Sequence, residues 1–145
     1  MKVKFKKLNP NATVPTYGSP YAAGADLYAC IDSQETIKAG ETKLIKTGIA
    51  IELPVGYAAF IYARSGLASK RGLAPANKVG VVDCDYRGEI MVALHNHSTT
   101  DQAIDPQERI AQMVIAPYIT AEFEEASELS DTVRGAGGFG STGTK

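Results

Sequence analysis

Apolar residues recur at every second position through much of this 145-residue chain. The clearest runs are Ile49, Ile51 and Leu53, then Tyr57, Ala59 and Ile61, and later Ile90, Val92 and Leu94. Side chains of a β-strand point alternately to opposite faces, so this period predicts strands with one buried face. Turn-forming sequences such as Asn9-Pro10-Asn11 and Pro54-Val55-Gly56 separate the runs at short intervals. The pattern therefore predicts an all-β sandwich or barrel in which only residues 65–71 form a helix.

Length and composition are those of one globular domain. The hydrophobic fraction of 44% and the charged fraction of 21% are close to average, and no apolar run approaches the ~20 residues that span a bilayer. Because the net charge is only −1, we expect neither nucleic acid nor a membrane as a partner, and any phosphate binding must be local. The basic N-terminus lacks the apolar stretch of a signal peptide. We therefore expect a cytoplasmic protein with Cys30 and Cys84 as reduced thiols.

The end of the chain differs in composition from the rest. Residues 134–145 contain five of the 14 glycines and no aliphatic side chain that could anchor them in a core. This change predicts a β domain over residues 1–133 and a flexible tail over residues 134–145. The glycine spacing fits neither a dinucleotide-binding turn nor a Walker A loop. A frayed terminus is one interpretation; the other is a lid over a phosphorylated base, with Arg134 binding phosphate and Phe139 stacking on the base.

The segment Ala63-Arg64-Ser65-Gly66 joins a predicted strand to the short helix. The Arg64 guanidinium, the Ser65 hydroxyl and the Gly66 amide are three donors in a row that would face an anion at this position. Taken alone, Ser65 is explained equally well as the N-cap of the helix.

Residues 77–91 are typical of a strand, a tight turn and a second strand. The first strand runs directly into Asp83 and Asp85, with Tyr86 behind them, so the mouth of the hairpin is acidic. One of the two carboxylates could be catalytic. Either aspartate alone is also explained as an ordinary turn residue.

Four further polar residues could have either a functional or a structural role. Asp26 lies at the start of a strand, and Gln112 lies within a strand among apolar neighbours, where its amide must find a partner. Either residue could be structural. His95 and His97 would share one face of a strand, but two histidines without a third ligand make a poor metal site. We expect both histidines to be surface or interface residues.

Taken together, five stretches in this order resemble the five motifs of the trimeric dUTPase family. The stretches are Ala23-Gly24-Ala25-Asp26-Leu27-Tyr28-Ala29, Arg64-Ser65-Gly66-Leu67-Ala68, Gly80-Val81-Val82-Asp83-Cys84-Asp85-Tyr86-Arg87-Gly88-Glu89, Glu108-Arg109-Ile110-Ala111-Gln112, and residues 134–143. The resemblance covers nearly the whole chain. One departure is Ala63, which stands where the family usually has proline; it loosens the backbone but removes no functional group.

The resemblance implies a distorted jelly-roll-like β subunit that forms a homotrimer with three shared active sites. It implies the Mg2+-dependent hydrolysis of dUTP to dUMP and pyrophosphate, by attack of water on the α-phosphorus. Such an enzyme limits the incorporation of uracil into DNA and supplies dUMP for thymidylate synthesis. The tail would close over the active site of a neighbouring subunit.

The resemblance also assigns roles to single residues. Asp83 matches the carboxylate that activates water, with Asp85 as second choice, and Asp26 would contact magnesium through water. Tyr86 would press on the deoxyribose and exclude a ribose hydroxyl. The residues expected to bind substrate are Arg64, Ser65, Gly66, Asn77, Gly80, Val81, Val82, Asp83, Tyr86, Met91, Gln112, Arg134, Phe139, Gly140, Ser141 and Thr142.

Two alternatives compete with this interpretation. A dCTP deaminase is similar in fold and in its triphosphate site, but it is expected to place a glutamate beside the pyrimidine, whereas Asp83 and Tyr86 favour the hydrolase. A jelly-roll protein that binds nucleotides without catalysis is the other alternative. The complete set of Asp83, Arg64, Gln112 and Arg134 argues against it.

Overall fold

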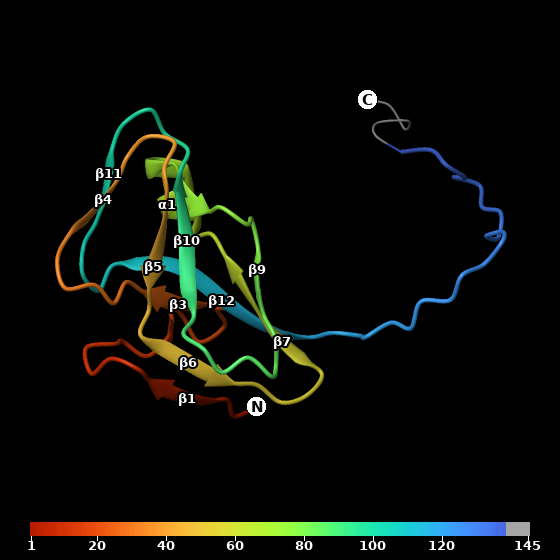
Figure 1. Ribbon diagram of the computed structural model, residues 1–145, viewed down its shortest axis with the longest axis horizontal. Helices are drawn as coiled ribbons and strands as arrows, with labels where there is room; N and C mark the ends of the chain where they lie inside the picture. Colours follow the sequence, from red (N-terminus) through yellow and green to blue (C-terminus); the bar gives the residue numbers. More distant parts are fainter. Residues whose placement is uncertain (139–145) are drawn as a thin grey trace.

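The computed structural model describes residues 1–138, in which twelve β-strands and one short helix form the body of the protein (Figure 1). The strands are β1 (Lys4–Lys7), β2 (Thr16–Tyr17), β3 (Ala25–Tyr28), β4 (Glu35–Ile37), β5 (Thr42–Lys46), β6 (Ile49–Glu52), β7 (Tyr57–Tyr62), β8 (Leu73–Pro75), β9 (Gly80–Val82), β10 (Met91–Asn96), β11 (Gln102–Ile104) and β12 (Arg109–Pro117), and the helix is α1 (Ser65–Arg71). The predicted all-β fold and the helix over residues 65–71 are both confirmed. Within residues 1–138, no helix has the length and apolar character needed to cross a membrane.

The strands pair in four antiparallel groups around one core. The orders are β2-β3-β12-β7-β9, β5-β10-β8, β1-β6 and β11-β4. Strand β12 lies at the centre of the largest sheet, between β3 and β7, and it crosses β10 in the view of Figure 1. Strand β9 pairs with β7 and forms one edge of this sheet. The backbone groups on the outer side of β9 are therefore not used by a neighbouring strand of the described chain.

The period-two pattern places one face of each main strand in the core. In β10, Val92, Leu94 and Asn96 are buried, whereas the residues between them are more exposed. The buried amide of Asn96 is satisfied, because its Nδ2 donates to the carbonyl of Ile37 at 2.9 Å. A buried polar group that keeps its partners costs little and fixes β10 against β4.

Helix α1 is held firmly against the sheet. It ends at Gly72, whose left-handed φ of 67° allows its N–H to bond the Ala68 carbonyl and close the last turn. Leu67 is buried, and the guanidinium of Arg71 binds the carboxylate of Glu108. The helix that follows Arg64 is therefore held by the packing of Leu67 and, at its last residue, by an ion pair to the segment before β12.

The chain leaves the β body after Pro117 (Figure 1, blue). The apolar side chains of Ile119, Phe123 and Leu129 are almost fully exposed along this extended segment. Strand pairing thus ends at Pro117, well before residue 134. The change in composition shows where the glycines begin, but it does not show where strand pairing ends. The division into residues 1–133 and 134–145 stays a prediction.

Candidate active site

The acidic turn between β9 and β10 is held by hydrogen bonds to its own backbone carbonyls. The N–H of Tyr86 bonds the Asp83 carbonyl at 3.2 Å, and the Arg87 guanidinium donates to the Cys84 carbonyl at 2.7 Å. The carboxylates of Asp83 and Asp85 are both exposed at this turn. The turn therefore has a defined backbone while its two acids remain open to water or a ligand.

A cavity of about 210 Å³ lies beside this turn. Its lining includes Asn77, Gly80, Val81, Val82, Tyr86 and Met91, which are six of the residues expected to bind substrate, together with Leu44, Ile61, Pro75, Glu89, Ile90, Val92 and Ala93. The structure thus brings these six predicted substrate-binding residues together around one cavity. A cavity of this kind, mostly apolar with a few polar groups, suits a flat base and a sugar.

Asn77 and Gly80 both line this cavity and approach each other closely. A Cβ atom added at Gly80 would lie 3.2 Å from Nδ2 of Asn77 and 3.3 Å from Cβ of Ile61. Glycine at this position lets the Asn77 amide lie near the backbone of β9. The amide and the edge of β9 are therefore neighbouring sources of hydrogen-bonding groups.

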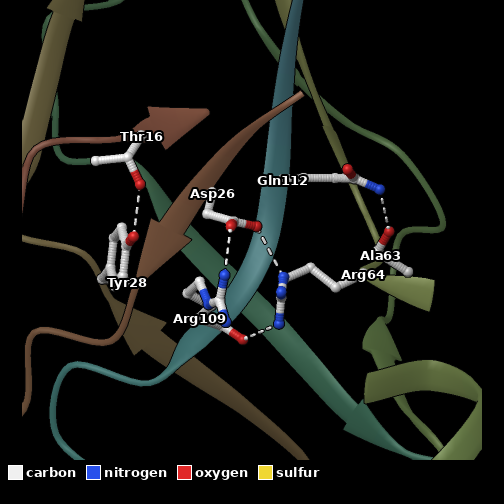
Figure 2. Close-up of polar contacts among 7 residues, drawn as sticks. All are labelled: Thr16, Asp26, Tyr28, Ala63, Arg64, Arg109 and Gln112. Carbon is white, nitrogen blue, oxygen red and sulfur yellow. Dashed lines mark hydrogen bonds and ion pairs between the residues drawn. The ribbon is translucent and has the colours of Figure 1, made fainter. Parts of the chain in front are cut away.

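A second polar group forms where β3, β12 and the end of β7 meet (Figure 2). Nε of Arg64 donates to Oδ1 of Asp26 at 2.7 Å, and Nη1 of Arg109 lies 3.3 Å from Oδ2 of the same carboxylate. Nη1 of Arg64 also donates to the Arg109 carbonyl at 3.3 Å. Two guanidinium groups share one buried carboxylate, so this corner carries a net positive charge and suits an anion. We call Asp26, Arg64, Arg109 and Gln112 the basic corner.

Gln112 supports the segment that carries Arg64. Its Nε2 donates to the Ala63 carbonyl at 2.9 Å (Figure 2). A Cβ atom at Gly24 would lie 2.8 Å from Oε1 of Gln112, so glycine leaves the space in which this amide lies. The predicted need of Gln112 for a partner is thereby met within the chain.

Ser65 and Gly66 open α1 beside the basic corner. The N-cap of the helix is Arg64, without a capping bond from its side chain, and Ser65 is the first helical residue. The alternative of Ser65 as N-cap is therefore wrong, because the helix starts one residue earlier than that role requires. A Cβ atom at Gly66 would meet nothing within 4 Å, so the space in front of this turn is open.

Arg109 is a member of the basic corner that sequence reasoning missed. In a regular strand, Arg109 and Gln112 are three residues apart and point to opposite faces. A register shift between Arg109 and Ala111 brings Arg109 opposite Tyr28 while Gln112 pairs with Asp26. The bulge therefore places both side chains on the same face, and no period-two pattern could have indicated it.

The described residues offer no protein cluster for a metal ion. Within residues 1–138, no group of three or more His, Cys, Asp or Glu side chains could hold one. His95 and His97 stack edge to face with ring centroids 4.3 Å apart, and Nδ1 of His95 contacts the Thr42 hydroxyl at 2.8 Å. Partial desolvation, with the nearby His95 and Lys78, lowers the pKa of His97. The expectation that both histidines are surface or interface residues stays a prediction.

The basic corner and the cavity do not share residues within one chain. The cavity lining includes none of Asp26, Arg64, Ser65, Gly66 or Gln112. Arg134 is exposed on the C-terminal segment, where its Nε donates to the Gly137 carbonyl at 2.8 Å. The expected roles of Phe139, Gly140, Ser141 and Thr142 lie outside the described residues.

Comparison with known proteins gives a consistent result. A model of the dUTPase family matches residues 10–143. The chain is 55% identical over 143 residues to the deoxyuridine 5'-triphosphate nucleotidohydrolase of Nautilia profundicola, covering 99% of both chains. It is 52% identical over 145 residues to that of a Hydrogenobaculum species, covering 100% of both chains.

The fold agrees with this match. The dUTPase of Staphylococcus bacteriophage 80alpha, solved with dUPNHPP, superposes with a TM-score of 0.90 at 27% sequence identity, covering 99% of each chain. The predicted jelly-roll-like β architecture is thereby confirmed. The family match over nearly the whole chain, the relatives at about half identity and the shared fold place this chain in the dUTPase family.

Proposed function

We propose that this protein hydrolyses dUTP to dUMP and pyrophosphate, with Asp83 activating the attacking water. The observation that carries the proposal is the cavity lined by Asn77, β9 and Tyr86, together with the exposed Asp83, which follows β9 directly in the sequence. Hydrolysis would remove dUTP and so limit uracil in DNA. The dUMP that it releases would supply thymidylate synthesis. A cytoplasmic location suits this role.

The edge of β9 supports recognition of uracil. Its outer backbone groups have no strand partner in the described chain, so Val81 and Val82 can present a fixed donor and acceptor to the base. Cytosine would leave buried polar groups unpaired, which is penalised far more than a change of one methyl group. A backbone that lies close to the base would leave little room for the methyl group of thymine.

Asp83 would act as a general base toward water. An ordinary carboxylate is a weak base, so this assistance contributes about 10²–10⁴-fold to the rate. Stabilisation of charge on the phosphates must provide the remainder. Asp85 is the second choice, because it is exposed on the same turn.

The basic corner would bind the triphosphate. Arg64 and Gln112 lie beside the open turn at Ser65 and Gly66, where phosphate oxygens can meet guanidinium, hydroxyl and backbone donors. When bound to the phosphates, Mg2+ neutralises part of their charge and fixes their geometry. Both oxygens of Asp26 already bind guanidinium groups, and each keeps a further lone pair for a water ligand of the ion. The donor set therefore fits indirect contact with magnesium and not a direct protein ligand.

A homotrimer with shared active sites would complete the substrate site. The cavity and the basic corner have no residue in common within one chain, although one triphosphate nucleotide must reach both. The C-terminal segment runs away from its own body in Figure 1 and exposes the apolar residues Ile119 and Phe123. Exposed apolar side chains of this kind typically become buried on a partner. The tail, with Arg134, Phe139, Gly140, Ser141 and Thr142, would then close on a neighbouring site.

Pyrophosphate release from dUTP, dTTP, dCTP and UTP tests the proposal, first with magnesium and then with EDTA. We expect release from dUTP alone and its loss with EDTA. Formation of dUTP from dCTP would instead identify a deaminase. Binding of dUTP without any release would support the protein without catalysis.

Mixing two inactive variants tests the shared site. Asp83→Asn changes the hairpin, and Arg64→Ala changes the basic corner. If one site uses the hairpin of one subunit and the corner of another, subunit exchange regenerates some intact sites and activity returns. Sedimentation should give three chains per particle. Mixtures that stay inactive despite exchange would place each complete site within one chain.

A further inference from the structure

The ring of Tyr86 folds back over the backbone of its own hairpin. Its hydroxyl donates to the Glu89 carbonyl at 3.0 Å. A Cβ atom added at Gly88 would lie 2.3 Å from the Tyr86 hydroxyl oxygen, 2.5 Å from Cζ and 2.9 Å from Cε2. The end of the ring therefore occupies the space that any side chain at position 88 would need.

Gly88 is not required by the conformation of the backbone. The glycines with positive φ in the described chain are Gly40, Gly48, Gly56, Gly72 and Gly135, and Gly88 is not among them. An alanine at position 88 is compatible with its backbone angles. What glycine provides here is the gap for the Tyr86 ring.

The acceptor of the Tyr86 hydroxyl is itself fixed. The Glu89 carboxylate accepts a hydrogen bond from the Gly48 N–H at 2.8 Å. The next residue, Ile90, donates its N–H to the Ile49 carbonyl at 2.8 Å, and its carbonyl accepts the buried Thr47 hydroxyl at 2.6 Å. Three bonds thus tie residues 89 and 90 to residues 47–49, which form the turn after β5 and the first residue of β6.

We propose that Gly88 and Glu89 are positioning residues for sugar selectivity, because together they hold Tyr86 as a fixed wall of the nucleoside cavity. This inference rests on the proposed function, in which Tyr86 contacts the deoxyribose. The additional hydroxyl of a ribose is rejected by shape only if the Tyr86 ring cannot move away from the sugar. The gap at Gly88 sets where the ring lies, and the anchored Glu89 carbonyl prevents the ring from rotating outward.

Gly88→Ala tests the role of the gap, with Gly18→Ala as the matched control. Nothing lies within 4 Å of a Cβ atom at Gly18, and its φ is not positive. The measured quantities are kcat/KM for dUTP, UTP and dTTP. In Gly88→Ala we expect the preference for dUTP over UTP to fall at least about tenfold, while the preference for dUTP over dTTP stays within about twofold. Both preferences should be unchanged in Gly18→Ala.

The outcomes separate the two levels of the proposal. A wild-type protein that releases no pyrophosphate from dUTP overturns the proposed function itself. If the wild type is active and Gly88→Ala keeps its preference for dUTP over UTP, the positioning role is wrong. An equal loss of both preferences would also overturn it, because the base pocket would then have been damaged together with the sugar wall.

Glu89 gives an independent variant that does not depend on the folding of Gly88→Ala. Glu89→Ala removes the acceptor of the Gly48 N–H, and Glu89→Gln keeps an oxygen that can accept it. We expect Glu89→Ala to lower the preference for dUTP over UTP several-fold and Glu89→Gln to retain more of it. Equal preferences in the two variants would show that this anchor does not hold the ring.

Discussion

Asp26 and Arg64 are 38 residues apart in the sequence, and their side chains meet in an ion pair with Nε of Arg64 2.7 Å from Oδ1 of Asp26 (Figure 2). Arg109 binds the other oxygen of the same carboxylate. The pair is mostly buried, with side-chain exposures of 27% for Arg64 and 12% for Asp26. Asp26 therefore orients the guanidinium that is proposed to bind phosphate, in addition to its proposed contact with magnesium through water.

Asp26→Asn should weaken catalysis without unfolding the protein. The amide keeps one acceptor for Arg64 but leaves two guanidinium groups without their counter-charge. Loss of a charged hydrogen bond costs about 1.5–3 kcal/mol, which corresponds to roughly 10–100-fold in kcat/KM. Steady-state kinetics over a range of magnesium concentrations would measure this effect.

The Lys4–Glu52 pair supplies a matched control for this change. Its atoms are 3.1 Å apart, but its side chains are 80% and 46% exposed, so Glu52→Gln should leave kcat/KM unchanged. If Asp26→Asn behaves like Glu52→Gln, the orientation of Arg64 does not depend on the carboxylate of Asp26.

Asp83→Asn should lower kcat and preserve binding of dUTP. The amide has the shape of the carboxylate but cannot accept a proton from water, so we expect kcat to fall about 10²–10⁴-fold. Calorimetric binding of a non-hydrolysable dUTP analogue would check that the site is intact. Asp85→Asn is the comparison, since it changes the other exposed acid of the same turn. A near-normal rate in Asp83→Asn together with a slow Asp85→Asn would transfer the role to Asp85.

Deletion of all residues after Thr132 should leave a folded protein with little activity. The strands end at Pro117, and no strand of residues 1–138 pairs beyond it, so the deletion removes nothing from the core. It does remove Arg134 and the glycine-rich tail. Circular dichroism and sedimentation would test folding and assembly, and pyrophosphate release would test activity. Full activity after the deletion would show that the tail is only a frayed end.

Local features of the fold could be predicted because local sequence determines them. Alternation in β10 follows from the spacing of Val92 and Leu94, and both are buried. The bounds of α1 agree with the prediction for residues 65–71, since Gly72 adopts the left-handed angle that ends a helix.

Long-range pairings could not be predicted in the same way. Strand β1 pairs with β6, and β4 pairs with β11 across a large separation in sequence. Periodicity identifies a strand but does not name its partner. Arg109 lies in the basic corner because of a bulge in β12. The hydrogen bond between Glu89 and Gly48 depends on two turns that meet only in the folded chain. The motifs predict the site residues by resemblance, whereas the contacts that hold these residues in place are tertiary.

The two cysteines should differ strongly in their reaction with a thiol reagent. Cys30 is buried, and this burial, with Glu89 and Asp32 nearby, raises the pKa of its thiol. A raised pKa leaves less thiolate at pH 8, so Cys30 should react slowly and faster only at higher pH. Cys84 is partly exposed, with its sulfur 3.6 Å from the Tyr118 hydroxyl.

We therefore expect the first equivalent of iodoacetamide to modify Cys84, as measured by mass spectrometry of peptides. An adduct at Cys84 lies next to Asp83 in sequence, so turnover of dUTP should fall in step with this first modification. Cys84→Ser should abolish the fast reaction, whereas Cys30→Ser should leave it intact. Fast modification of Cys30 in the native protein would contradict its burial, and a fully modified Cys84 with normal turnover would show that the turn tolerates bulk beside Asp83.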